Sequence, residues 1–249
     1  MIVKYHKKID ILILAAGKGS RSGLSYHKSL FKINGSSIIS LIIRKLKFLK
    51  SRFTLVINES NKEDFESEML LEDINFDFVF QNNPLGMGDA VLKFEDSKNF
   101  MSSENILLSW GDLPYIKIST YKKMVYEHFE NDNDFTFITA DSDNAYTRVI
   151  RDKDKKIIDL IETHEDGSHP FRGERDIGIF IFKTKKIIET LKKNLDGKYG
   201  KKTGEHSFLY IVKHLVKEGM KVQGYKIATT KELISLNTEH DIKLIKSYK

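Results

Sequence analysis

The sequence predicts an α/β fold of three layers, in which helices cover both faces of a mostly parallel central sheet. Segments of strand length alternate along the chain with longer segments of helical periodicity, which favours parallel strands joined by crossover helices. Residues 11–14 are four consecutive aliphatic residues, as in a parallel strand that is buried on both faces. No repeat or Pro/Gly/Ser-rich linker divides the chain, so we expect one domain over residues 1–249.

Strands and helices alternate in order through the first part of the chain. The expected strands are short and rich in aliphatic, β-branched or aromatic residues: 11–14, 53–57, 76–80, 106–110 and 135–139. The expected helices have apolar residues at helical spacing: 37–49, 89–100 and 119–129. These lengths fit crossover connections between neighbouring parallel strands.

The second part of the chain has a different pattern. Residues 146–161 are expected to form a small hairpin, and residues 177–182 another strand. A helix is expected over residues 205–217, with Phe208, Leu209, Val212, Leu215 and Val216 turned inward. Gly219 is well placed to end this helix.

Composition is that of an ordinary globular protein. A chain of 249 residues with 40% hydrophobic and 31% charged residues can bury one sizeable core. The absence of cysteine excludes disulfides and thiolate metal sites and favours a reducing compartment. No apolar run approaches the roughly 18 residues of a membrane span, and the apolar stretch after the N-terminus is too short for a signal peptide. We therefore expect a cytoplasmic protein that does not contact membranes.

The basic charge of the chain does not by itself indicate a nucleic-acid partner. The formal net charge is +6, but basic and acidic residues are interleaved, as in residues 151–156. No alternation of aromatic and basic residues suited to stacking on bases is present. We expect a lysine-rich surface on a protein that also handles anionic substrates, with no nucleic-acid partner.

A glycine-containing loop directly follows the first strand. Residues 14–21 read Leu-Ala-Ala-Gly-Lys-Gly-Ser-Arg, and Lys28 comes soon after. Gly17 and Gly19 allow a sharp turn, and successive backbone N–H groups in such a turn can bind an anion. Arg21 and Lys28 add positive charge suited to phosphate oxygens. The loop therefore predicts that a nucleoside triphosphate is held at the carboxyl end of the first strand.

The glycine pattern alone leaves a structural alternative open. The third glycine of the dinucleotide-binding motif is missing, and no Gly-Lys-Ser/Thr follows at the spacing of a P-loop. On the glycines alone, a tight strand-to-helix turn with solvent-exposed basic residues is an equal alternative.

Further segments carry a family resemblance in the expected order. Residues 81–90 (Gln-Asn-Asn-Pro-Leu-Gly-Met-Gly-Asp-Ala) resemble a base-reading segment, and residues 110–114 (Trp-Gly-Asp-Leu-Pro) resemble a metal-binding Gly-Asp-x-Pro. Together with the loop at 14–21, Lys28, and residues 161–162, 176–179 and 236–237, they resemble the nucleotidyltransferases that activate sugar phosphates. The resemblance covers roughly residues 9–248 and is nearest to the pyrophosphorylase domain of N-acetylglucosamine-1-phosphate uridylyltransferases. It implies a Rossmann-like nucleotidyltransferase fold, with a nucleotide-binding half at about 9–140 and an acceptor-binding half at about 141–249.

The resemblance also implies a reaction. An acceptor phosphate oxygen attacks the α-phosphorus of a nucleotide and pyrophosphate leaves, so positioning and charge neutralisation do most of the work. Arg21 would hold the β- and γ-phosphates, and Lys28 would bridge the α-phosphate and the acceptor phosphate. The implied nucleotide-binding residues are Leu14, Ala15, Ala16, Gly17, Gly19, Gln81, Gly86 and Asp112.

Magnesium is the cofactor that the resemblance implies. Asp112 follows a strand at the edge where ligands bind in open α/β sheets, and Asn237 falls where the family has its second metal ligand. Mg²⁺ prefers oxygen ligands and takes only one or two from protein, the rest coming from phosphates and water. The alternative for Asp112 is a turn-forming residue before proline.

Base and acceptor residues are assigned by the same resemblance. Gln81 and Gly86 would read a pyrimidine, since a side-chain amide can pair with uracil or cytosine by flipping. Glu162 and Asp176 fall at acceptor-contacting positions.

Several residues depart from the uridylyltransferase pattern. Met87 and Asp89 stand where that pattern has Thr and His, and residues 145–147 replace its Gly-Tyr-Gly. Asp176 replaces the Asn that contacts the acetamido sugar, and an ionised carboxylate cannot donate a hydrogen bond. Residues 26–30 (Tyr-His-Lys-Ser-Leu) look more like cytidylyltransferases that activate small phosphates. Asp89 and Asp176 would suit an amino or cationic acceptor, and N-acetylglucosamine 1-phosphate is not expected to be the natural one.

The sequence thus predicts a Mg²⁺-dependent nucleotidyltransferase that uses CTP or UTP and a phosphorylated acceptor. The acceptor would be a sugar 1-phosphate or a small phosphorylated metabolite, in the synthesis of surface polysaccharide or cell-envelope precursors. A catalytically silent nucleotide-binding regulatory module is the alternative. The acceptor, the choice between CTP and UTP, and the oligomeric state are left open.

Overall fold

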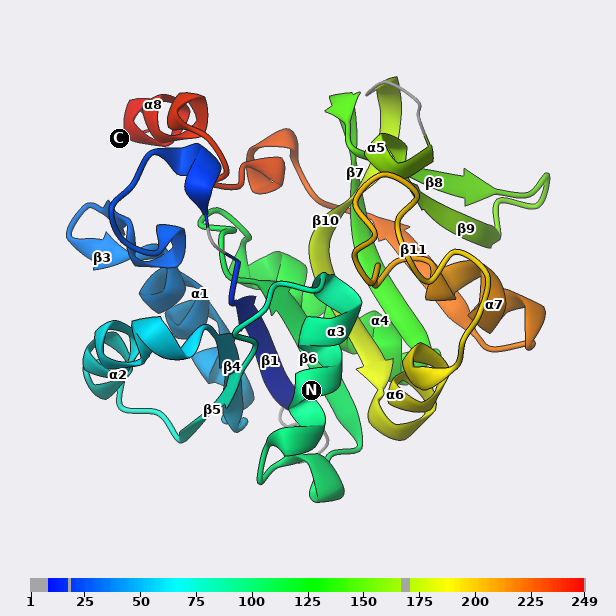
Figure 1. Cartoon of the computed structure of the whole chain (residues 1–249). Coiled ribbons are helices and arrows are strands. Elements are labelled where there is room, and N and C mark those ends of the chain that lie inside the picture. Colours follow the sequence, from blue (N-terminus) through cyan, green and yellow to red (C-terminus); the bar gives the residue numbers. More distant parts are fainter. Residues whose placement is uncertain (1–8, 18, 167–170, 249) are drawn as a thin grey trace.

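A central sheet of seven strands runs through the computed structural model, which describes residues 9–17, 19–166 and 171–248 (Figure 1). In spatial order its strands are β11 (Val222–Lys226), β7 (Phe135–Ala145), β10 (Phe171–Lys183), β6 (Asn105–Trp110), β1 (Ile9–Ala15), β4 (Phe53–Ile57) and β5 (Phe76–Phe80). The β1–β4, β1–β6, β4–β5 and β7–β11 pairs are parallel, whereas β10 is antiparallel to both of its neighbours. The prediction of a mostly parallel sheet is confirmed.

Helices cover both faces of this sheet. Helices α1 (Ile38–Leu46), α2 (Lys62–Leu70), α4 (Ile118–Glu130) and α8 (Glu239–Ser247) contribute to one apolar cluster. Helices α3 (Met87–Leu92), α6 (Thr184–Lys192) and α7 (Ile211–Lys217) contribute to another. Along β1, Ile11 and Ile13 belong to the first cluster and Leu12 to the second, because successive strand residues point to opposite faces. The predicted three-layer arrangement is confirmed (Figure 1).

Smaller elements complete the described chain. Strands β2 (Lys32–Ile33) and β3 (Ser36–Ser37) form one short antiparallel pair. Strands β8 (Thr147–Arg151) and β9 (Ile157–Glu162) form the hairpin that the sequence predicts. Helix α5 (Thr163–Asp166) follows β9. The short 3₁₀ segments are η2 (Ser20–Ser22), η3 (Lys28–Leu30), η4 (Lys47–Leu49), η5 (Glu59–Asn61), η6 (Lys93–Asp96), η7 (Phe100–Ser102) and η8 (Thr230–Leu233).

Some predicted boundaries are corrected by tertiary pairing. The expected helix over 205–217 begins only at Ile211, because the segment before it pairs by backbone hydrogen bonds instead of coiling. The His206 N–H donates to the Leu85 carbonyl (2.7 Å), and the Ser207 N–H donates to the Lys198 carbonyl (2.9 Å). The expected helix over 89–100 is divided into α3, η6 and the start of η7.

Strands β7 and β10 are longer than the sequence predicts. β7 extends to Ala145 and β10 begins at Phe171, because the two strands pair well beyond the expected apolar segments. β7 also crosses the boundary expected near residue 140, and β10 and β11 enter the same sheet as β1. Within the described residues, no helix has both the length and the apolar character needed to cross a membrane.

The order of strands determines where ligands can bind. β1 lies between β4 on one side and β6 on the other, so connections leave β1 and β6 in opposite directions along the sheet. Crevices in open α/β sheets form at such reversals, at the carboxyl ends of the strands. The loops after β1 and β6 therefore border the same crevice.

Candidate active site

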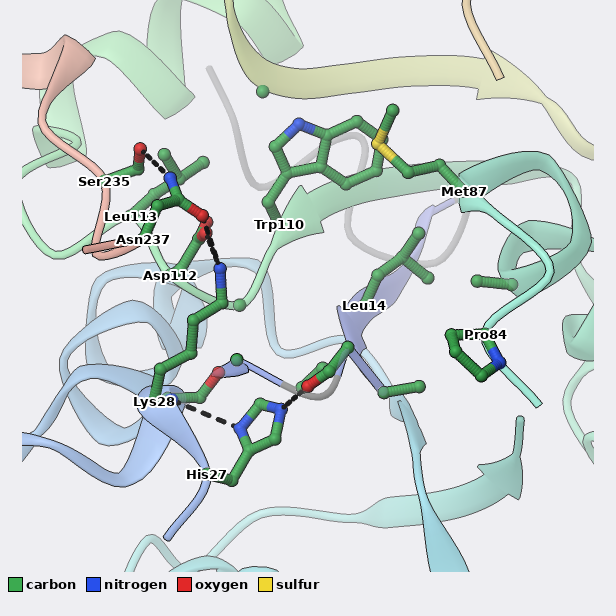
Figure 2. A pocket seen from close by; sticks show the side chains of 18 of the residues that line it. Leu14, His27, Lys28, Pro84, Met87, Trp110, Asp112, Leu113, Ser235 and Asn237 are labelled. Carbon is green, nitrogen blue, oxygen red and sulfur yellow. Dashed lines mark hydrogen bonds and ion pairs between the residues drawn. The ribbon is translucent and has the colours of Figure 1, made fainter. Parts of the chain in front are cut away.

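A cavity of about 590 Å³ lies at the carboxyl ends of β1 and β6. It is lined by every residue that the sequence assigned to catalysis, nucleotide or metal: Leu14, Ala15, Ala16, Gly17, Gly19, Arg21, Lys28, Gln81, Gly86, Asp112 and Asn237. These residues come from five separate parts of the chain, and the fold brings them together (Figure 2). Their chemical roles remain predictions.

The loop after β1 is shaped by its glycines. Gly19 has φ +61°, a left-handed conformation that glycine adopts without steric cost. A Cβ atom on Gly17 would meet no atom within 4 Å, so this backbone is open for close approach by a ligand. Ser22 closes the turn, since its hydroxyl donates to the Gly19 carbonyl (2.7 Å). Lys18 lies outside the described residues.

The His27 side chain supports this loop by a hydrogen bond to the backbone of Gly17. The Ser29 N–H donates to His27 Nδ1 (3.2 Å), so Nε2 carries the proton and donates to the Gly17 carbonyl (2.9 Å; Figure 2). The ring is buried and packs against Phe65, with 5.2 Å between ring centroids. Burial lowers the pKa of His27 to about 4, so the ring is neutral at physiological pH. The sequence analysis gave this residue no role.

Lys28, Asp112 and Asn237 meet at one point of the cavity. Lys28 Nζ lies 2.6 Å from Asp112 Oδ2 and 2.7 Å from Asn237 Oδ1 (Figure 2). The Asn237 amide is oriented by donation from Nδ2 to Ser235 Oγ (2.8 Å), which leaves Oδ1 facing the ammonium group. A cation therefore already sits between the two oxygens that the sequence assigned to a metal.

Backbone hydrogen bonds bring these three residues together. The Gly111 N–H donates to the Leu14 carbonyl (2.9 Å), which joins the ends of β6 and β1. A Cβ at Gly111 would lie 2.9 Å from that carbonyl oxygen, so a side chain there would disturb the junction. The Leu236 N–H donates to the Asp112 carbonyl (3.1 Å) and so places Asn237 beside the carboxylate.

The oxygen atoms at this point fit a magnesium ion. Asp112 Oδ1 is buried and has no hydrogen-bond partner among the described residues, so one carboxylate oxygen is free to bind a cation. Asn237 supplies an amide oxygen, and both are the hard ligands that Mg²⁺ prefers. Within the described residues there is no group of three His, Cys, Asp or Glu side chains that could hold a metal. Two protein ligands suffice where phosphates and water supply the rest.

Gln81 holds the segment 81–90, to which the sequence analysis assigns contact with the base. Its side chain is buried, and Nε2 donates to the Gly86 carbonyl (3.0 Å) and to Asp89 Oδ2 (2.8 Å). The Gly88 N–H donates to the His206 carbonyl (2.9 Å), so the second half of the chain closes over this segment. The expectation that Asp89 faces a cationic acceptor is corrected, because its carboxylate contacts Gln81 and it does not line the cavity.

The predicted acceptor residues lie outside the cavity. Asp176 is buried, and its carboxylate accepts from Thr147 Oγ1 (2.5 Å) and the Gly178 N–H (2.9 Å). It therefore shapes a turn of β10 and does not line the main cavity, and its acceptor role stays a prediction. Glu162 lies in a second cavity of about 130 Å³ and accepts from Ser207 Oγ, and burial raises its pKa.

Other residues of the second half do line the main cavity. Arg175 lies over the ring of Tyr146, with 5.2 Å between the guanidinium carbon and the ring centroid. Glu205, Ile177 and Gly178 also line it. Gly178 has φ +79°, and a Cβ there would lie 2.3 Å from Trp110 Cδ1. The sequence signal for Arg175 was its position beside Asp176 on a strand, where alternate residues face opposite ways.

A family model matches residues 11–201 and is described as a MobA-like NTP transferase domain. Among curated proteins, the bifunctional protein GlmU of Thermodesulfovibrio yellowstonii is 31% identical over 246 residues, covering 96% of this chain and 52% of that protein. GlmU of Buchnera aphidicola is 29% identical over 240 residues, covering 96% of this chain and 50% of that protein. The chain thus spans about half the length of these relatives.

Solved structures share the fold at low sequence identity. A putative glucose-1-phosphate thymidylyltransferase from Bacillus anthracis superposes with a TM-score of 0.74 at 17% identity, covering 96% of this chain and 94% of that one. The inositol-1-phosphate CTP transferase from T. maritima superposes with a TM-score of 0.72 at 17% identity, covering 97% and 96%. With the family match over most of its length, the chain belongs to the MobA-like NTP transferase domains and is a nucleotidyltransferase.

Proposed function

We propose that this protein transfers a pyrimidine nucleotidyl group from CTP or UTP to a phosphorylated small molecule, with Mg²⁺ as cofactor. The observation that carries this proposal is the meeting of Lys28, Asp112 and Asn237 in the cavity that the glycine loop also lines. The arrangement combines a glycine loop suited to binding an anion, a lysine ammonium group, and a carboxylate oxygen that has no hydrogen-bond partner among the described residues. Such a set suits the transfer of a phosphoryl-linked group between two anions.

The chain's own residues position the reacting groups. An oxygen of the acceptor phosphate attacks the α-phosphorus, the bond from that phosphorus to the bridging oxygen breaks, and pyrophosphate leaves with the electron pair. Arg21 lines the cavity and forms no ion pair with a described carboxylate, so it is free to hold the β- and γ-phosphates. Lys28 offsets negative charge between the α-phosphate and the acceptor phosphate. Bound Mg²⁺ would neutralise the charge of the triphosphate.

Charge in the second half of the cavity supports a phosphorylated acceptor. Arg175 of β10 lines the same cavity as the glycine loop. Its planar guanidinium group can bind phosphate oxygens. Its stacking on Tyr146 restricts its motion and so lowers the entropy lost on binding. We place the acceptor, a sugar 1-phosphate or a small phosphorylated metabolite, beside these residues.

A cellular role follows from this chemistry. Products that carry a nucleotide on a phosphorylated sugar or metabolite are activated donors for building larger molecules. We therefore propose a cytoplasmic enzyme that supplies precursors of surface polysaccharide or the cell envelope, with no nucleic-acid or membrane partner.

A substrate screen tests the proposal. Each of CTP, UTP, ATP and GTP is combined with Mg²⁺ and a set of sugar 1-phosphates and small phosphorylated alcohols, and pyrophosphate release is measured. We expect turnover with a pyrimidine nucleotide and one acceptor class, and a fall of roughly 10³-fold in turnover after Asp112→Asn. Nucleotide binding without turnover for any acceptor in the set would favour the silent regulatory module instead.

A further inference from the structure

The carbonyl oxygens of the two loop glycines accept hydrogen bonds from within the protein. The Gly17 carbonyl accepts from His27 Nε2 (2.9 Å). The Gly19 carbonyl accepts from both the N–H (2.9 Å) and the hydroxyl (2.7 Å) of Ser22. The N–H groups of Gly17 and Gly19, by contrast, donate to no other described residue. The loop thus keeps its acceptors engaged and its donors free, as an anion-binding loop requires.

His27 is the residue on which the first of these carbonyl contacts depends. Among the described residues, only His27 donates to the Gly17 carbonyl. Without that donor, the peptide group after Gly17 could rotate and turn its carbonyl oxygen toward a bound phosphate. Two oxygens that carry negative charge repel each other, so the rotation would weaken binding of an anion.

The same ring also fixes the segment that carries Lys28. His27 is the N-terminal cap of η3, since its Nδ1 accepts from the Ser29 N–H (3.2 Å). Lys28 is the first residue of η3, and a Cβ on Gly19 would lie 3.6 Å from Lys28 Cγ. The stem of the lysine therefore runs against the glycine loop. One buried ring joins the loop to the segment that bears the lysine, and all of these residues except Ser22 line one cavity (Figure 2).

We propose that His27 is a positioning residue for the β- and γ-phosphates of the nucleotide, which it serves by holding the Gly17 carbonyl and so leaving the loop N–H groups to the phosphates. The inference rests on the proposed function, because it takes the glycine loop as the site of these phosphates. His27 acts through the backbone and need not touch the substrate.

Two substitutions separate the two hydrogen bonds of His27. His27→Asn has an oxygen at the place of Nδ1 and can still cap η3, but it has no atom at the place of Nε2. His27→Gln has an amide nitrogen at the place of Nε2 and can still donate to the Gly17 carbonyl. The pair therefore distinguishes the contact with the loop from the cap.

The test is calorimetric binding of inorganic pyrophosphate, and of CMP and UMP, with Mg²⁺ present. Pyrophosphate represents the β- and γ-phosphates, which the monophosphates lack. We expect His27→Asn to weaken pyrophosphate binding by roughly 3- to 10-fold, the scale of one lost hydrogen bond, and to change binding of the monophosphates by less than about twofold. His27→Gln should bind pyrophosphate within about threefold of the wild type. In turnover assays, His27→Asn should raise KM for the nucleoside triphosphate and leave KM for the acceptor unchanged.

A second buried histidine provides the control for folding. His128 of α4 is also buried and holds Thr136 (2.9 Å) and Asn105 (3.2 Å) through its two ring nitrogens, but it does not line the cavity. His128→Asn should lower the melting temperature without changing the affinity for pyrophosphate relative to the monophosphates. A merely structural role for His27 would give the same result in His27→Asn.

Three results would overturn the inference. Wild-type affinity of His27→Asn for pyrophosphate shows that the loop does not need His27. Equal weakening of pyrophosphate and monophosphate binding shows a general loss of structure. Equal weakness of His27→Asn and His27→Gln shows that the contact with Gly17 is not what matters. The proposed function fails separately, if the wild type binds pyrophosphate but transfers no nucleotide, and the comparison of variants still decides the role of His27 in the loop.

Discussion

The two halves of the cavity differ in how directly the sequence determines them. In the nucleotide half, the residues predicted from the sequence all line the cavity, from Leu14 to Asp112. In the acceptor half, Glu162 lies in a separate cavity and Asp176 is turned into the protein, whereas Arg175 lines the main cavity. The comparison shows that residues at the ends of parallel strands can be placed from sequence order, and residues along an irregular antiparallel strand cannot.

The physical reason lies in β10. Its pairing with β7 shifts register between Asp176 and Phe180, where Gly178 has a positive φ. Such a bulge changes which way the following side chains point. Alternation holds from Arg175 to Ile177, since both line the cavity and Asp176 between them faces the protein interior, and it is interrupted only after Asp176. The carboxyl ends of β1 and β6, by contrast, meet at one edge because the two strands are parallel neighbours.

The largest effect is expected from the nucleotide half, for Asp112→Asn. This change keeps the shape of the side chain but removes the charge that binds the cation. We expect kcat to fall by roughly 10³-fold in assays of pyrophosphate release, the upper scale for loss of one preorganised electrostatic contact. The melting temperature should change little. Near wild-type kcat at saturating Mg²⁺ in a folded variant would refute the metal-ligand role.

Lys28→Met should have the next largest effect, and it also tests whether Lys28 competes with the metal ion for Asp112. Loss of the ammonium group should lower kcat by ~100-fold, because a preorganised charge at the transferred phosphate is removed. The same change removes the cation that lies 2.6 Å from Asp112 Oδ2. Without nucleotide, Mn²⁺ titrated in place of Mg²⁺ and followed by water proton relaxation should therefore bind more tightly to the variant. Weaker binding to the variant would show that Lys28 supports the metal instead of competing with it.

Neighbouring residues of β10 test the acceptor half. Arg175→Gln should raise KM for the acceptor by about 10-fold with kcat less affected, since a charged hydrogen bond to the acceptor phosphate is lost. Asp176→Asn should instead lower stability by roughly 1–3 kcal/mol, because its new amide hydrogens and the Gly178 N–H compete within a buried turn. If Asp176→Asn alone altered acceptor KM, the sequence-based assignment would be right and the cavity-based one wrong.

The smallest expected effect is a pH dependence of stability in the nucleotide half. His27 has a pKa of about 4 in the folded protein and 6.5 in the unfolded chain. Its contribution is complete above pH 6.5 and is lost as the pH falls toward 4, because only the unfolded chain binds the proton there. Between pH 7.5 and pH 5, denaturant unfolding should show a loss of stability to which the buried His128 and His206, whose pKa values are also lowered to about 4, contribute as well. Of this loss, roughly 1–2 kcal/mol should disappear in His27→Gln. The exposed His240 of α8 provides the control, and His240→Gln should leave the pH dependence unchanged.

The sequence by itself determined the layered α/β fold, the strands near β1, β4, β5 and β6, and the residues that line the nucleotide half. Hydrophobic periodicity is local and predicts the strands, whereas the residues of the nucleotide half follow from the resemblance of ordered motifs to the nucleotidyltransferases. Several of these motifs lie at strand ends that share one edge of the parallel sheet. Only the tertiary structure decided that His27 supports the glycine loop, that Asp89 holds Gln81, and that Arg175 replaces Asp176 at the cavity. The first two depend on side-chain hydrogen bonds between residues 10 and 8 positions apart, and the third on which face of β10 each residue occupies. None of these contacts is specified by the hydrophobic pattern of the chain.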